Sequence, residues 1–207
     1  MAEKRDCGHN YYGECEQRRI YRRLVAFFLL LIALVLLAVL VVWLVLRPTG
    51  PRFYLHDASL VQLNLTADAA FLTSVLHVTL SSRNPNDRIG VYYDRLVAYG
   101  RYHRQQITTA TVLPAGYQSR QERTVWSPYL FGGAVPLAPD LAGALLQDQQ
   151  AGYVLLSVRV DGRLRWKVGT WVSGRYHLHV NCPALLVLDA GAYKYEFQHN
   201  TRCSVDI

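Results

Sequence analysis

The stretch VLLSVRVDGRLRWKV at residues 154–168 indicates a β fold more clearly than any other part of this chain. From Val154 to Val160 every second residue is apolar, which is the period of a strand that buries one face. The dipeptide Asp161-Gly162 is a common two-residue turn of a β-hairpin. A second alternating run, from Leu164 to Val168, then predicts the returning strand. We therefore expect an antiparallel hairpin here.

The same period appears on both sides of this stretch. Alternating or β-rich runs at Leu72–Leu80, Val91–Tyr102 and Tyr176–Cys182 each predict a strand. The sequence Asn84-Pro85-Asn86-Asp87 is expected to end the first of them. Proline lacks a donor for the sheet, and Asn and Asp side chains close turns.

One segment departs from the strand period. Leu137–Gln150 has apolar residues at helical spacing, Pro139 suits a first helical turn, and Gly152 follows as a stop signal. The distal chain is therefore expected to be mainly β: an antiparallel β-sandwich of about seven strands with one short helix.

An uncharged, apolar run from Leu24 to Leu46 precedes this domain. As a helix it would be about 34 Å long, enough to cross a hydrocarbon core of about 30 Å. The apolar region of a signal peptide is shorter and ends in small residues at a cleavage site, whereas Arg47-Pro48 follows here. We expect an uncleaved transmembrane helix.

Charge predicts the orientation of that helix. Arg18, Arg19, Arg22 and Arg23 crowd its N-terminal flank, and basic residues near the other end are fewer. The positive-inside rule then keeps the N-terminus in the cytosol. Four parts are expected: a cytosolic basic tail (1–23), the transmembrane helix (24–46), a stalk with the first strand region (47–70), and an extracytoplasmic domain (71–207).

The net charge does not indicate a nucleic-acid-binding protein. The formal net charge is +7, but basic residues of the distal part are scattered over strands instead of forming one stripe. A domain translocated across a membrane would also not meet the genome. The expected partners are the membrane, other proteins, or a second copy of this chain.

The cysteines divide between the two sides of the predicted helix. Cys182 and Cys203 fall on the far side, where disulfides persist. If paired, they would close a loop worth roughly 3 kcal/mol in the chain-entropy model. On the near side, Cys15 is a candidate for palmitoylation, with a free thiol as the alternative.

Asn64-Leu65-Thr66 is an acceptor sequence for N-glycosylation. The predicted topology places Asn64 in the secretory lumen, so we expect it to be a glycan site.

Motifs that carry chemistry are absent from the sequence. It contains no Gly-rich phosphate loop, no G-x-S-x-G elbow and no H-E-x-x-H. His177 and His179 share one strand face, but two imidazoles without a third ligand do not predict a metal site. Ser, His and Asp occur, yet a triad is recognised by geometry. We expect no catalytic residues, no metal and no cofactor.

Several stretches together resemble a known plant family. They are Arg83-Asn84-Pro85-Asn86, Ile89-Gly90-Val91-Tyr92-Tyr93-Asp94, Gly116-Tyr117-Gln118, Val160-Asp161-Gly162-Arg163, Arg165-Trp166-Lys167-Val168-Gly169-Thr170-Trp171, Tyr176-His177-Leu178-His179-Val180-Asn181-Cys182-Pro183 and Cys203-Ser204-Val205. The chain resembles the harpin-induced and non-race-specific disease-resistance family, whose distal domain is of the late-embryogenesis-abundant group-two type. One departure is Gln118-Ser119-Arg120, where many members have Gln-Gly-His or Gln-Gly-Lys.

The resemblance implies residence at the plasma membrane, with plasmodesmata as a further location, and a part in pathogen defence, the hypersensitive response or stress signalling. Family members are not known as enzymes and have no agreed catalytic residues. The Asn84-Pro85-Asn86 block has a sufficient explanation as a turn that ends a strand.

Three functions stay open at this point. The first is a defence protein that acts through protein contacts or by linking membrane to wall. The second is a lipid- or hydrophobe-binding module, which an apolar cavity above about 300 Å³ would favour. The third is a hydrolase, which a Ser–His–acid constellation would favour.

Overall fold

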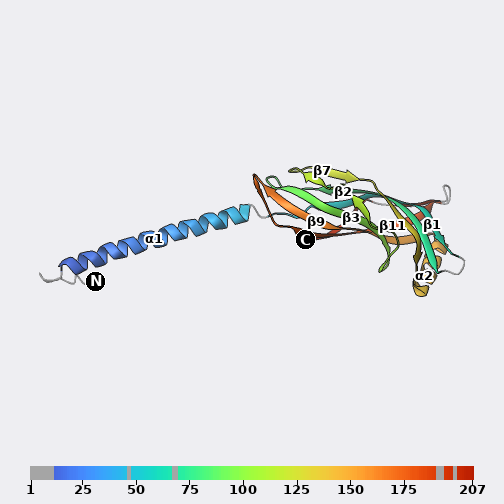
Figure 1. Ribbon diagram of the computed structural model, residues 1–207, viewed down its shortest axis with the longest axis horizontal. Helices are drawn as coiled ribbons and strands as arrows, with labels where there is room; N and C mark the ends of the chain where they lie inside the picture. Colours follow the sequence, from blue (N-terminus) through green and yellow to red (C-terminus); the bar gives the residue numbers. More distant parts are fainter. Residues whose placement is uncertain (1–11, 46–47, 67–69, 190–193, 198–199) are drawn as a thin grey trace. The chain divides into compact units, whose positions relative to one another are not determined.

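Strands dominate the chain beyond residue 48 in the computed structural model (Figure 1). The structure describes residues 12–45, 48–66, 70–189, 194–197 and 200–207. The chain divides into two compact units, Met1–Arg47 and Pro48–Ile207. Of the elements described, one helix belongs to the first unit and all the strands belong to the second.

Helix α1 (Tyr12–Val45) is the main element of the first unit. Its segment Arg18–Leu40 contains an 18-residue window with a mean hydropathy of 3.0 and is long and apolar enough to cross a membrane. The helix begins well before Leu24, inside the stretch predicted as a tail. Extending an existing helix is cheap compared with nucleating one, so the polar residues before the apolar run can join it. Leu46, the predicted last residue of the span, lies outside the described residues.

Fourteen strands of the second unit form one antiparallel sheet. The long ones are β1 (Arg52–Leu65), β2 (Phe71–Arg83), β3 (Gly90–Tyr102), β8 (Tyr129–Pro136), β9 (Tyr153–Val168) and β11 (Tyr176–Asp189). The short ones are β4 (Gln105–Gln106), β5 (Thr111–Leu113), β6 (Gly116–Gln118), β7 (Arg123–Trp126), β10 (Trp171–Val172), β12 (Lys194–Phe197), β13 (Thr201–Arg202) and β14 (Ser204–Asp206). The central order is β4-β3-β9-β11-β12-β1-β2-β7.

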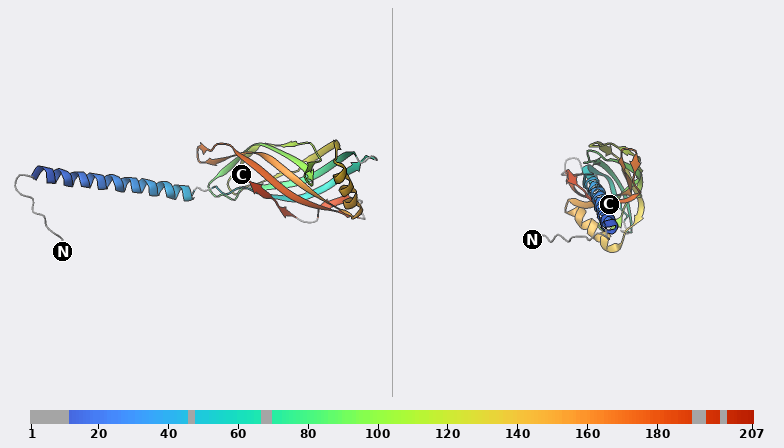
Figure 2. Two further views of the ribbon diagram at one scale, coloured as in Figure 1. Left: turned by 90° about the horizontal axis from the view of Figure 1, so that it is seen from below. Right: turned by 90° about the vertical axis from the view of Figure 1, so that its left-hand side faces the viewer.

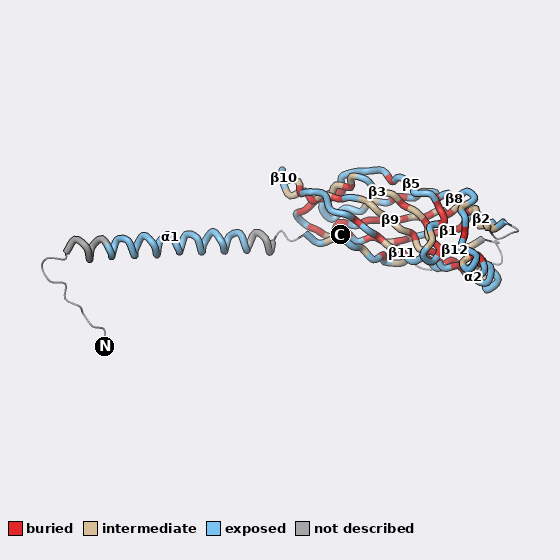
Figure 3. Tube along the Cα trace, turned by 60° about the horizontal axis from the view of Figure 1, so that its bottom comes forward, coloured by how far each residue is buried: buried red, intermediate tan, exposed pale blue. Residues whose placement is uncertain are grey.

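The sheet curls so that its two halves share one core (Figure 2). Phe53 of β1 stacks on Trp126 of β7 at 6.2 Å between ring centroids, and Tyr93 of β3 meets Phe53 edge-on at 6.3 Å. β3 and β7 are near opposite ends of the strand order, so these rings can meet only because the sheet folds over. Buried residues alternate with intermediate or exposed ones along much of the long strands (Figure 3). The prediction of a mainly β, antiparallel, sandwich-like domain is confirmed.

The hairpin predicted at Asp161-Gly162 is wrong. Strand β9 runs without a break through both residues and pairs with β3 and β11 on its two sides. The glycine serves a close approach instead of a turn: a Cβ at Gly162 would lie 2.1 Å from the carbonyl oxygen of Arg95. The pairing of β3 with β9 has a register shift between Tyr93 and Arg95, next to that carbonyl.

The turn that does end β9 lies at Gly169-Thr170. Val168 pairs with Trp171 across it, and Gly169 has φ +58, a conformation in which glycine carries no steric penalty. Strand β10 therefore folds back on β9.

The short helix predicted for the domain is α2 (Pro139–Gln150). Its first residue is proline, which suits a first helical turn, and Gly152 with φ +79 follows its end. Ala142 and Leu145 are buried against the sheet. The hydroxyl of Tyr102 in β3 donates to a carboxylate oxygen of Asp148 at 2.7 Å and ties the helix to the strand.

Substituting Gly162 by valine should destabilise the domain strongly, because the new side chain has to displace backbone. We expect the free energy of unfolding to fall by about 3 kcal/mol in Gly162→Val. Gly116→Val is the matched control, since a Cβ there meets nothing within 4 Å. Denaturant unfolding of the full chain in detergent measures both, and equal stability of the two variants would contradict the close approach.

Candidate functional site

Several of the family-like stretches meet at one end of the domain, where the chain comes in at Pro48. We call this the linker end; it comprises Thr49–Arg52, the turns Asn84–Gly90 and Gln118–Arg123, and the β9–β10 hairpin. Strand pairing brings these pieces together, since Arg52 pairs with Arg83 and Gly90 pairs with Lys167. Strand β10 lies at this end and α2 at the other (Figure 3).

Asn84 holds two turns of the linker end together. It is fully buried, and its Nδ2 donates to the carbonyl oxygens of Ile89 at 2.7 Å and Ser119 at 2.9 Å. Its Oδ1 accepts from the backbone N–H of Asn86 at 3.1 Å and from the Nδ2 of that residue at 2.9 Å. The backbone N–H of Asn84 donates to Glu122. Every donor and acceptor of this amide has a partner within the protein.

Asn86 carries the same network to the linker. Its Oδ1 accepts from the backbone N–H of Thr49 at 2.9 Å, and its Nδ2 donates to the carbonyl oxygen of Thr49 at 2.7 Å. This pair of bonds copies the pairing that one strand offers another. The Asn84-Pro85-Asn86 block therefore ends β2 and also fixes the first residues of the domain.

Tyr93 and Gln118 close the curled sheet at this end. The Tyr93 hydroxyl lies 2.7 Å from the Ser82 hydroxyl and donates to Oε1 of Gln118 at 3.0 Å. Nε2 of Gln118 donates to the carbonyl oxygen of Ser82 at 2.9 Å and also to Thr124 in β7. Burial raises the pKa of Tyr93 far above its ordinary value, partly offset by the bond to Ser82, so the phenol keeps its proton. No role for Gln118 was predicted from the sequence.

Tyr92 and Lys167 form a cationic, aromatic surface beside this closure. The Tyr92 and Tyr117 rings lie 4.7 Å apart, and the Lys167 ammonium lies 5.5 Å and 5.0 Å from their respective centroids. Lys167 Nζ also donates to the Tyr92 hydroxyl at 3.3 Å. These cation–π contacts hold the ammonium in place without a carboxylate.

Arg165, two residues before Lys167, is neutralised instead. It binds the carboxylate of Asp94 with two nitrogens, the shortest distance being 2.6 Å, and Arg175 adds a contact at 3.4 Å. The hydrogen bonds from Arg165 hold the pKa of Asp94 below its ordinary value, against the effect of burial.

Comparison with known proteins identifies the family. A family model described as late embryogenesis abundant protein matches residues 79–183. NDR1/HIN1-like protein 1 of Arabidopsis thaliana is 40% identical over 98% of this chain and 100% of its own length. NDR1/HIN1-like protein 12 of the same plant is 41% identical over 98% of this chain and 99% of its own length.

This chain belongs to the NDR1/HIN1-like family.

The resemblance drawn from the sequence is thereby confirmed. A third relative, NDR1/HIN1-like protein 26 of Arabidopsis thaliana, is 38% identical over 83% of this chain and 82% of its own length. The late embryogenesis abundant match contains Asn84, Gln118 and Trp166, whereas Thr49 and Cys203 fall outside it. In this NDR1/HIN1-like chain, the segments around Thr49 and Cys203, which lie before and after the matched residues, both reach the linker end.

The two tryptophans of the NDR1/HIN1-like motif have different roles. Trp166 is only 6% exposed and belongs to the core, and its backbone N–H donates to the Ser173 hydroxyl at 2.9 Å. Trp171 is 62% exposed and follows the Gly169-Thr170 turn. Sequence spacing did not separate the buried ring from the exposed one.

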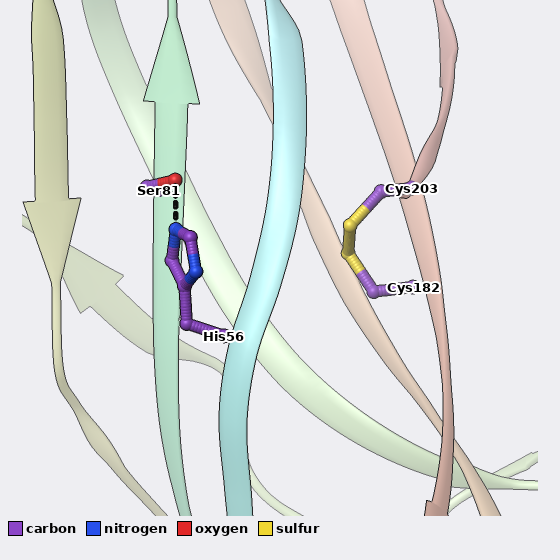
Figure 4. The surroundings of a disulfide bond; sticks show 4 residues. All are labelled: His56, Ser81, Cys182 and Cys203. Atoms are coloured by element: carbon purple, nitrogen blue, oxygen red, sulfur yellow. Dashed lines mark hydrogen bonds between the residues drawn. A yellow bond between two sulfur atoms is a disulfide. The ribbon is translucent and has the colours of Figure 1, made fainter. Parts of the chain in front are cut away.

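The structure joins Cys182 of β11 to Cys203 by a disulfide (Figure 4). Their Cα atoms are 4.4 Å apart and both residues are buried. The backbone N–H of Cys203 donates to the carbonyl oxygen of Phe53 at 3.0 Å. The last residues of the NDR1/HIN1-like chain are thus tied to both β11 and β1.

A Ser–His pair lies near the disulfide (Figure 4). Nε2 of His56 is 2.6 Å from the Ser81 hydroxyl, but Ser81 is fully buried. Over the described residues, no carboxylate is bonded to His56, so no third group orients the imidazole as a triad requires. His179 is bonded to Asp161 at 2.8 Å, and no group of three or more metal-ligating side chains was found where the structure describes the chain.

The two modification candidates lie in different units. Asn64 is exposed in β1, whose pairing with β2 continues to Leu65. It is twelve residues beyond Arg52, and an extended strand of that length spans about 40 Å. Its glycosylation stays a prediction, and so does palmitoylation of Cys15. Cys15 belongs to α1, but its side chain lies outside the described residues.

Replacing Asn84 by alanine should destabilise the domain, because Ile89, Ser119 and Asn86 would each lose a buried partner. We expect the free energy of unfolding to fall by about 3 kcal/mol, measured by denaturant unfolding of the full chain in detergent. The exposed Asn200 supplies the control: Asn200→Ala should change stability by less than about 0.5 kcal/mol. An Asn84→Ala protein as stable as the control would show that the block does not support the fold.

Removing the disulfide should also cost stability. Cys203→Ser is expected to lower the free energy of unfolding by about 2–4 kcal/mol, because the unfolded chain gains conformational freedom. Cys15→Ser, outside the domain, should leave domain unfolding unchanged. Thiol labelling of the folded protein should find Cys182 and Cys203 unreactive, and labelling of both would refute the pairing.

Proposed function

We propose that this protein is a plasma-membrane-anchored component of plant defence or stress responses that works through contacts and not through catalysis. Membership of the NDR1/HIN1-like family supports the defence role. The length and hydropathy of α1 support the anchor. In this proposal the N-terminus faces the cytosol, the β domain lies outside the cell, and plasmodesmata are a further location.

One observation supports a non-catalytic role: the buried polar groups of the family motif form their hydrogen bonds within the domain itself. The side-chain amides of Asn84 and Gln118 hydrogen-bond to backbone and side chains of the domain. The buried Tyr93 hydroxyl donates to Gln118, and burial keeps the phenol neutral. Groups used in this way support a surface and do not attack a substrate. The exposed residues around them are then available to a partner.

The hydrophobe-binding alternative lacks a specific observation in its favour. A hollow of about 420 Å³ lies at the linker end, but Arg52 and Arg202 are among its lining residues and it opens to solvent. The interior between the two halves of the sheet is filled by packed side chains such as Phe53, Leu76 and Leu156. We therefore favour contact with partners over uptake of an apolar ligand.

Signal transfer across one helix would require association of two copies or capture of a second membrane protein. The cytosolic tail in this proposal is short, but Arg18, Arg19, Arg22 and Arg23 and the tyrosines Tyr11 and Tyr12 could dock a partner. Tethering would then be essential, because it keeps tail and domain on one molecule.

Rescue of plants that lack the gene tests tethering. The wild-type chain should restore the pathogen response, and so should a chain whose Leu24–Leu46 is exchanged for an unrelated transmembrane helix. A chain with a cleavable signal peptide in place of residues 1–46 should accumulate outside the cell and fail. Full rescue by this secreted protein would contradict the proposal.

Topology is checked independently on sealed right-side-out vesicles. Added protease should degrade the β domain and spare the N-terminal tail. Survival of the domain with loss of the tail would overturn the orientation.

The non-catalytic role has a test of its own. Turnover of any small substrate that is abolished by a point change in the domain would overturn that role.

A further inference from the structure

We propose that the linker end carries a binding site for the phosphate group of a membrane lipid, in the same bilayer that α1 crosses. The site is a hollow of about 230 Å³ beside the Asn84–Gly90 turn. This inference rests on the anchored topology proposed above and adds a ligand to it.

The hollow is lined by three cationic side chains and by no acidic one. Its lining residues are Arg88, Gly90, Tyr117, Arg120, Lys167 and Gly169. The three cations come from three separate segments that the fold brings together. Within the described part of the chain, no carboxylate forms an ion pair with any of them. Arginine and lysine converging on a small hollow is the arrangement that recognises phosphate oxygens.

The floor of this hollow is shaped by a glycine. A Cβ at Gly90 would lie 2.3 Å from the Tyr117 hydroxyl, so the tyrosine ring occupies the space that a side chain would take. The same ring contacts the Lys167 ammonium. The ammonium is therefore positioned by aromatic faces and keeps its charge available for a ligand.

More positive charge lies on β1, β2 and β7 at the linker end. Arg52, Arg83 and Arg123 pair in register across β1, β2 and β7, and all three are exposed. Like charges directly opposite each other destabilise a sheet, so this row weakens the isolated domain. An anionic surface facing the linker end would remove that cost.

The linker explains why that surface is a bilayer. Helix α1 ends at Val45, and Thr49 is already bonded to Asn86. The intervening chain can span at most about 14 Å, four residues at full extension. Chain length alone thus keeps the linker end near the headgroups wherever α1 is inserted. Lysine and arginine at such a surface gain about fivefold in affinity per charge for anionic lipid.

Trp171 supports the same surface independently. This residue is 62% exposed at the β9–β10 hairpin, close to Gly169 of the hollow. Tryptophan favours the membrane–water interface, where the ring is sheltered and its N–H still finds a partner. A site for free phosphate would have no use for an exposed tryptophan or for a short tether.

Native mass spectrometry of the full chain in detergent micelles tests the site by counting bound lipids. The chain is titrated with short-chain phosphatidic acid, with phosphatidylcholine of the same chain length, and with inorganic phosphate. The double variant Arg88→Gln/Arg120→Gln should bind one phosphatidic acid fewer than the wild-type chain. In Lys167→Gln, that phosphatidic acid should still bind, with an affinity lower by about fivefold. Circular dichroism verifies that the variants, changed at the surface, keep their strands.

Arg163→Gln is the matched control. Arg163 is also exposed and also pairs with an arginine, Arg95, but it does not line the hollow. The Arg163→Gln chain should bind as many lipids as the wild-type chain. A second control changes the tail arginines Arg18, Arg19, Arg22 and Arg23 to glutamine, and it should keep the lipid bound at the hollow.

Equal loss in Arg163→Gln and the pocket variants would overturn the site. Inorganic phosphate that binds to the wild type as tightly as phosphatidic acid would overturn the lipid as its ligand. The two proposals can be told apart. Lipid counting in detergent tests the binding site without a bilayer, so loss of this site would leave the anchored topology standing. The protease test on vesicles measures topology alone and says nothing of lipid binding.

Discussion

The contacts of two asparagine side chains decide how this domain begins. Asn84 joins the turn after β2 to the turn before β7, and Asn86 pairs with both backbone groups of Thr49. The second contact fixes the backbone of Thr49 to the turn after β2. The first residues of the domain therefore belong to the same hydrogen-bonded network as the family motif.

The family motif combines two tasks through the alternation of a strand. In Tyr92-Tyr93 one ring faces the surface and its neighbour closes the core. In Trp166-Lys167 the order is reversed, with the tryptophan inside and the lysine beside the tyrosine rings. Each pair of adjacent residues thus supports the fold with one side chain and offers chemistry with the other. Motif residues on the inner face are poor candidates for ligand contacts, and those on the outer face are good ones.

Hydrophobic periodicity predicted strands in the regions of β2, β3, β9 and β11 and the short helix, but not β8, the short strands or the connections. The hairpin at Asp161-Gly162 was inferred from turn preference alone. The alternation of apolar residues already argued against this turn. Val160 and Leu164 face the same side if the strand is continuous. A two-residue turn would instead place Val160 opposite Arg163 and turn Leu164 to the other face. The role of Gln118 and the row at Arg52, Arg83 and Arg123 depend on strand register and sheet closure. Neither can be obtained from one sequence, because partners distant along the chain determine them.

Hydrogen exchange at the amide of Thr49 tests the central constraint most directly. In the full chain, its N–H donates to Oδ1 of Asn86, so this account predicts exchange as slow as that of the paired amides in β1. The Asn86→Ala protein should exchange the same amide rapidly while the core of β2 stays protected. Exchange of Thr49 at the rate of an unstructured peptide in the wild-type chain would contradict the account, because Asn86 would then not hold the first residues of the domain.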